Sequence, residues 1–99
     1  MAQMRIIDHP LAESRMIWMR EYSPQLMLSL HKQGMLKENV EKEVQIALGI
    51  QDRFEKKGLH PEDAQEAALM HVAPSQALPE SSSMISNKKY QEIEDEIRS

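Results

Sequence analysis

Residues 15–36 read RMIWMREYSPQLMLSLHKQGML and carry the signals of two helices, their junction and a stop. Ser23 is suited to accept a hydrogen bond from the unpaired N–H groups at the start of a helix. Pro24 follows it with a backbone φ fixed near the helical value. Gly34 ends that helix, because glycine takes the left-handed conformation that other residues avoid. The stretch therefore predicts a helix, a tight junction and a second helix.

The apolar residues have helical spacing along the whole chain, and the alternating pattern of a strand does not occur. The sequence therefore predicts an all-α fold, a small bundle of four helices at about 9–22, 24–33, 36–57 and 61–72. A linker and a short C-terminal helix follow the bundle. We expect three parts, namely a helical domain at 1–72, a linker at 73–86 and a short C-terminal helix or tail at 87–99.

Further start and stop signals lie outside the opening stretch. Asp8 is the expected N-cap of the first helix, and His60 is a cap or turn residue before the fourth. Gly58 repeats the stop at Gly34. Gly49 lies inside the third helix, where it lowers helix propensity by about 1 kcal/mol relative to alanine. It is either a point of close approach for another helix or a tolerated surface glycine.

The first two helices carry wide apolar faces. On the first helix, one stripe consists of Leu11, Arg15, Trp18 and Tyr22, and a second beside it of Ala12, Met16 and Met19. Such an arc requires more than one neighbour, either within the fold or in a dimer. The second helix places Leu26 with Leu30 and Met27. The core stripe of the third helix is Leu36, Val40, Val44, Ala47, Leu48 and Phe54.

The C-terminal helix has a narrow apolar face formed by Tyr90, Ile93 and Ile97. It is too short to be stable alone, since isolated helices below about 12 to 15 residues are marginal in water. It docks on its own domain, on a second copy or on a partner, or it frays. We expect a chain without residues 81–99 to keep its helical core.

Composition excludes several classes of protein. A chain of 99 residues is one domain at most, and without cysteine it has neither disulfides nor thiolate metal sites. No secretory signal or membrane-spanning run is recognisable, which predicts a cytoplasmic protein without membrane contact. The net charge of −4 and the 4% of aromatic residues disfavour direct nucleic-acid binding.

No catalytic, metal or cofactor motif stands out, and we expect a protein that is not an enzyme. The four histidines lack the spacing of paired metal ligands, and the three glycines form no phosphate-binding loop. The acids of the third helix are expected on solvated faces, as Glu38, Glu41, Glu43 and Asp52.

Eight methionines in 99 residues are a marked excess. Flexible thioethers fill irregular gaps in a core and also line adaptable binding surfaces, and the pattern leaves both readings open. Aromatic residues and methionine are enriched at the centres of interfaces. The candidate protein-interaction residues are therefore Met16, Trp18, Met19, Tyr22, Met27, Tyr90, Ile93 and Ile97.

A family resemblance extends from Arg15 to about Ala47. The residues that carry it are Arg15, Trp18, Met19, Arg20, Glu21, Pro24, Leu26, Leu30, Gly34 and Leu36, followed by an amphipathic helix. This third of the chain resembles the TnpV group of small transposon-encoded accessory proteins. The resemblance implies a bacterial or mobile-element origin and a compact helical fold, and it implies no catalytic residues.

The sequence thus predicts a helical protein-interaction module, an accessory protein of a bacterial mobile element that binds a protein partner or a second copy of itself. The alternative is an acidic phage or transposon regulator that blocks a nucleic-acid-binding partner. Added salt distinguishes the two, because binding to a basic groove weakens with salt and apolar anchoring does not. The least favoured function is DNA binding as a helix-turn-helix, since Glu38, Glu41 and Glu43 would face phosphates.

Overall fold

The computed structural model describes residues 5–74 and 85–98, and every regular element in these ranges is helical. The all-α prediction is confirmed. The elements are the 3₁₀ helix η1 (Ile6–Asp8) and the α-helices α1 (Pro10–Tyr22), α2 (Pro24–Lys32), α3 (Leu36–Lys56), α4 (Pro61–Val72) and α5 (Asn87–Arg98). No helix in these ranges is both long and apolar enough to cross a membrane.

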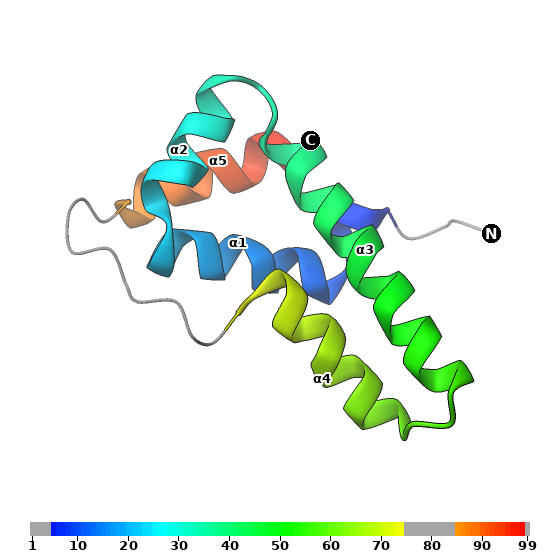
Figure 1. Cartoon of the computed structure of the whole chain (residues 1–99). Helices are drawn as coiled ribbons and strands as arrows, with labels where there is room; N and C mark the ends of the chain where they lie inside the picture. Colours follow the sequence, from blue (N-terminus) through cyan, green and yellow to red (C-terminus); the bar gives the residue numbers. More distant parts are fainter. Residues whose placement is uncertain (1–4, 75–84, 99) are drawn as a thin grey trace.

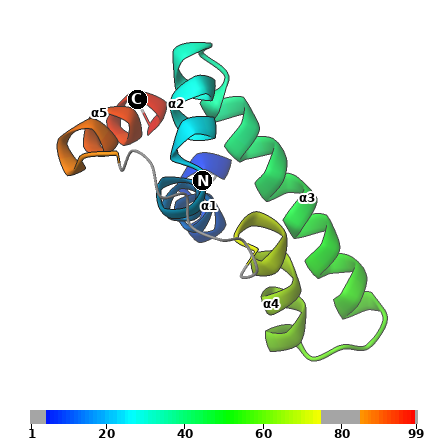
Figure 2. The same ribbon diagram turned by 60° about the vertical axis from the view of Figure 1, so that its left-hand side comes forward.

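The helices are arranged around α1. Helices α3 and α4 lie side by side and run in opposite directions, and α1 packs against both of them (Figure 1). Helices α2 and α5 lie beside each other at the other end of the molecule (Figure 2). Because α1 contacts η1, α2, α3 and α4, its wide apolar arc is used within the fold.

Both glycine stops are confirmed. Gly34 and Gly58 have φ values of 72° and 93°, in the left-handed region that favours glycine. After Gly34, the N–H of Met35 donates to the carbonyl oxygen of Leu30 at 2.9 Å, and the same backbone bond follows Gly58 at 3.1 Å. Gly49 differs from these two because it lies inside α3 without a positive φ, and a Cβ atom there would meet nothing within 4 Å. It is a surface glycine rather than a point of close helix approach.

The cap of α1 differs from the prediction. Nδ1 of His9, not Asp8, accepts a hydrogen bond from the N–H of Leu11, at 3.0 Å. Asp8 belongs to η1, and its carboxylate pairs with the guanidinium of Arg5 at 2.9 Å. His60 caps α4 in the same way as His9 caps α1, which confirms its predicted role. Each histidine has an extended backbone and precedes a proline, so it takes the cap position directly before that helix.

Helix α2 also shows two corrections. Ser23 makes no side-chain capping bond, although Pro24 occupies the first helical position as predicted. Met27 is fully buried and Leu30 is half-buried, but Leu26 is 44% exposed. Adjacent helical residues point about 100° apart. Because Met27 faces the core, Leu26 is turned toward solvent.

The main core joins helices from both ends of the described chain. Its buried members are Ile7, Ala12, Met16, Met19, Met27, Leu36, Val40, Val44, Ile85, Tyr90, Ile93 and Ile97. Ile93 is fully buried, and Tyr90 and Ile97 are less than a tenth exposed. Helix α5 therefore docks on its own domain, which was one of the alternatives that the sequence left open.

A second, smaller cluster holds the α3–α4 hairpin together. Ala47 of α3 packs with Ala68 and Val72 of α4, and half-buried Leu11 of α1 lies against them. Small side chains let the two helices approach closely. The cluster leaves one flank of α4 uncovered, where Leu69, about 100° around the helix from Ala68, is 41% exposed.

Candidate protein-interaction groove

A groove runs between α1 and the outer face of α4, and we call it the α1–α4 groove. It consists of two hollows that share Ser14 and Leu69. The first hollow has a volume of about 440 Å³ and is lined by His9, Pro10, Leu11, Ser14, Gln51, Gln65 and Leu69. The second has a volume of about 330 Å³ and is lined by Ser14, Ile17, Trp18, Glu21, Tyr22, Leu69, Ala73 and Pro74.

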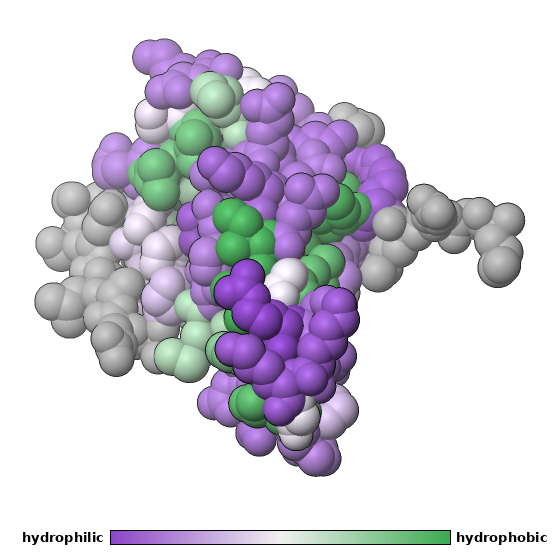
Figure 3. All heavy atoms as spheres, turned by 45° about the vertical axis from the view of Figure 1, so that its right-hand side comes forward, coloured by the Kyte–Doolittle hydropathy of each residue, from purple (hydrophilic) through white to green (hydrophobic). Residues whose placement is uncertain are grey.

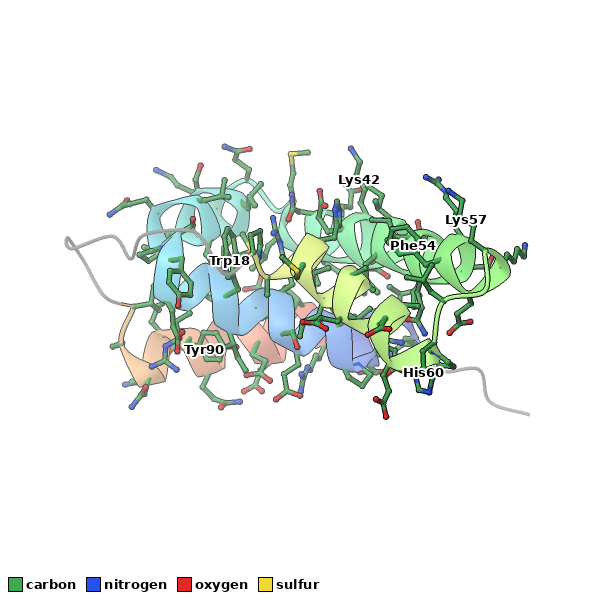
Figure 4. All side chains as sticks on the ribbon, turned by 60° about the horizontal axis from the view of Figure 1, so that its bottom comes forward. Trp18, Lys42, Phe54, Lys57, His60 and Tyr90 are labelled. Atoms are coloured by element: carbon green, nitrogen blue, oxygen red, sulfur yellow. The ribbon has the colours of Figure 1, made fainter. Side chains whose placement is uncertain are left out.

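The aromatic end of the groove is fixed by hydrogen bonding and stacking. The indole N–H of Trp18 donates to the carbonyl oxygen of Pro74 at 2.9 Å. The ring of Tyr22 lies one helical turn further on, tilted by 31° with its centroid 6.1 Å from that of Trp18. Such a pair presents a large apolar area at little further cost in side-chain entropy. Trp18 lies between helices in Figure 4, with part of its ring still accessible.

Arg15 ties α1 to the end of α4. Its Nη1 donates to the carbonyl oxygen of Val72 at 3.0 Å, and its guanidinium lies 4.9 Å from the centroid of the Trp18 ring. Burial lowers the pKa of Arg15, and the charge of Glu43 opposes that shift. Because its guanidinium donates to the last residue of α4 and lies over the indole ring, Arg15 stabilises the packing of α1 against α4.

A polar pair fixes α4 against α3. Nε2 of His71 and a carboxylate oxygen of Glu43 are 2.7 Å apart, and their side chains are 30% and 22% exposed. The expectation that Glu43 lies on a solvated face is therefore wrong, because α4 covers this side of α3. The pair and the small-residue cluster together hold Leu69 on the outer face of α4.

The predicted interaction residues fall into two groups. Trp18 and Tyr22 both line the groove and are half-buried. The remaining candidates are buried in the protein's own main core, and these are Met16, Met19, Met27, Tyr90, Ile93 and Ile97. In this conformation they are packed against one another, and the methionine face that the sequence left undecided is core.

Two large, exposed apolar residues of the lining were missed by the sequence analysis. Ile17 and Leu69 are large aliphatic residues, and they are 43% and 41% exposed. A signal for Leu69 exists in the sequence, because the alanines and Val72 already supply the inner face of its helix. Ile17 lies at the edge of the first apolar stripe and has no comparable signal.

Other exposed apolar residues do not form a comparable groove. They are Leu26, Met35, Ile46, Leu59 and Met70. On the face drawn in Figure 3, apolar side chains gather in separate patches with hydrophilic side chains between them. A smaller hollow of about 160 Å³ lies between α2, α3 and α5 near Gly34 and Glu96.

The described residues were compared with the ligand sets of metal sites and with known proteins. No three His, Cys, Asp or Glu side chains within residues 5–74 and 85–98 lie close enough to hold a metal together. The polar lining of the groove consists of hydroxyl, amide, imidazole and carboxylate groups spread over its length. Comparison of the chain with family models, curated proteins and solved structures gives no match.

Proposed function

We propose that this chain is a non-enzymatic protein-interaction module that binds a helical segment of a partner in the α1–α4 groove. The groove follows α1, whose 13 residues extend about 20 Å at about 1.5 Å per residue. Helix-in-groove binding uses apolar side chains at helical spacing on the bound segment. A length of 20 Å corresponds to about three to four helical turns of such a segment.

The observation that carries the proposal is an apolar floor that includes Leu69, which lines both hollows beside the polar Ser14. Ile17, Trp18 and Tyr22 add apolar lining in the second hollow. The helices on each side are fixed by the Arg15 and His71 contacts described above. A groove with fixed walls loses little conformational entropy on binding, which favours affinity.

Trp18 provides a direct test, because it is the only tryptophan of the chain and it lies in the groove. Amphipathic peptides without tryptophan are titrated into the protein, and the Trp18 emission is followed. We expect saturable binding that Leu69→Asp weakens by about tenfold or more, since it places a charge in the apolar floor. Met70→Asp is the matched control, because Met70 is 50% exposed on the same helix and does not line the groove.

The paired variants make the result specific. Both substitutions add one carboxylate to the surface of α4, so general electrostatic or folding effects influence them alike. Circular dichroism confirms that each variant is folded. Equal binding by the Leu69→Asp and Met70→Asp proteins would place the peptide outside the groove and refute the proposal.

The proposal also covers the arrangement of the helices and the origin of the protein. We infer that α1–α4 act as one four-helix bundle, a single cooperative unit in the cytoplasm of a bacterial host. Its role there is that of an accessory protein of a mobile element, as the resemblance of residues 15–47 to TnpV proteins implies. Coincident urea unfolding transitions by Trp18 fluorescence and circular dichroism would support the single unit.

A second candidate function rests on the outward face of α5. Glu92 and Asp95 are exposed there, and Glu96, also exposed, lies 3.4 Å from Nε2 of His31 on α2, while the apolar face of the helix is buried. This acidic surface supports the alternative function, that of a regulator whose acids occupy a basic groove of a nucleic-acid-binding protein. The variant with Glu92→Gln, Asp95→Asn and Glu96→Gln, tested with and without added salt, distinguishes this function from groove binding, which does not involve α5.

A further inference from the structure

The carboxylate that lines the α1–α4 groove has no basic side chain beside it in the lining. Glu21 lines the second hollow, and no lysine or arginine lines either of them. Helix α4 carries Glu62, Asp63 and Glu66 and has no lysine or arginine, so these side chains give it a charge of −3. All three acids are exposed. The groove is therefore an apolar channel beside an acidic wall.

Several basic side chains of α1 and α3 are directed elsewhere. Lys42 on the exposed face of α3 and Lys57 directly after its end point away from the molecule (Figure 4), and Lys56 pairs with Asp52 at 3.0 Å. On α1, Arg20 lies over the Tyr90 ring at 4.6 Å and donates a hydrogen bond to the side chain of Asn87. Arg15 is committed to Val72 and Trp18. The groove therefore has no lining cation to neutralise its acidic wall.

The two hollows set the spacing of the apolar anchors. Along α1, the first hollow is centred near Leu11 and the second near Trp18, seven positions apart. Seven positions correspond to about 10 Å along a helix axis. A bound helix that lies along α1 thus inserts one apolar side chain into each hollow from positions i and i+7, with a third at i+4 over Leu69.

From these observations we infer that the occupant is a basic amphipathic helix of another protein. Its apolar side chains at i, i+4 and i+7 enter the groove, and lysine or arginine side chains beside them face Glu21, Glu62 and Glu66. This inference rests on the proposed function and adds the chemistry of the partner. Charge complementarity of this kind raises the rate of association and selects among partners more than it raises affinity.

Three matched peptides of about 14 residues test the charge of the occupant, since this length covers the groove. They share leucine at i, i+4 and i+7 and differ only in their flanking residues, which are lysine, glutamine or glutamate. We expect the lysine peptide to bind about tenfold more tightly than the glutamate peptide, because several weak exposed ion pairs act together. High salt is expected to remove this preference.

Variants of the protein locate the effect. The protein with Glu21→Gln, Glu62→Gln and Glu66→Gln should bind all three peptides alike, whereas Glu92→Gln, Asp95→Asn and Glu96→Gln should leave the preference unchanged. Equal binding of the three peptides to the unmodified protein overturns the inference on charge and leaves the proposed function intact. No binding by any peptide refutes both. Self-association that Leu69→Asp abolishes identifies a second copy as the occupant and also overturns the inference.

Discussion

Ile93→Ala tests whether α5 is part of the core. Ile93 is fully buried among residues of α1, α2 and α3, and truncation to alanine removes three carbon atoms from a closely packed site. Large-to-small changes of this kind cost about 2 to 5 kcal/mol. A domain of this size has about 5 to 15 kcal/mol of total stability. A loss of about 3 kcal/mol lowers the melting temperature by roughly 12 to 24 °C.

The assay is urea unfolding followed by circular dichroism, with thermal melts as a second measure. Ile17→Ala is the matched control, because it is the same chemical change at a side chain that is 43% exposed. We expect the control to lose about 1 kcal/mol or less, as is usual for surface substitutions. If the two variants have the same stability, α5 is not docked in solution and the assignment of Ile93 to the core is wrong.

Four further predictions concern single sites. Gly49→Ala should raise the free energy of unfolding by about 1 kcal/mol in urea titrations, because alanine has the higher helix propensity and its methyl group meets open space. Gly34→Ala should lower the free energy of unfolding by about 1 to 2 kcal/mol in the same assay, because the residue has a positive φ. Burial raises the pKa of Tyr90 above 10.0. The contribution of the neutral phenol to stability is therefore complete below pH 10 and is lost as the pH rises through the folded-state pKa. In thermal melts at alkaline pH, Tyr90→Phe should reduce this loss of stability. The hydrogen bond from Arg5 lowers the pKa of Asp8 below 3.8. The stabilising effect of the Asp8 carboxylate is therefore present above pH 3.8 and is lost as the pH falls through the folded-state pKa. Arg5→Ala should return the pKa of Asp8 toward 3.8 in an NMR titration.

The signals that the sequence reveals best are those that depend on a few neighbouring residues. The stops at Gly34 and Gly58 are confirmed because a left-handed residue and the bond after it are local features. The cap of α1 was assigned one residue too early. Aspartate has the stronger intrinsic preference for a cap, but the salt bridge with Arg5 holds Asp8 in η1.

Features that depend on packing between distant segments were harder to predict. The periodicity of Tyr90, Ile93 and Ile97 predicts an apolar face, but it does not say which surface covers that face. Glu43 resembles the other acids of its helix until α4 brings His71 to it. The groove itself is made by two helices about 50 residues apart in sequence, so only Trp18 and Tyr22, on one of its walls, were recognisable as candidate anchors.

The joining of both ends of the described chain in one core has a consequence for synthesis. Ile7 packs in the same cluster as Ile93, and the guanidinium of Arg5 donates to the carbonyl oxygen of Arg98 at 2.7 Å. Translation proceeds at about 5 to 20 residues per second, so residues 73–98 follow over roughly 1 to 5 s. During that interval the nascent chain lacks Tyr90, Ile93 and Ile97, which belong to the same buried cluster as Met16, Met19 and Met27. Helix α5 is therefore the element of the described chain that completes this cluster and reduces the apolar surface open to chaperones and to other nascent chains.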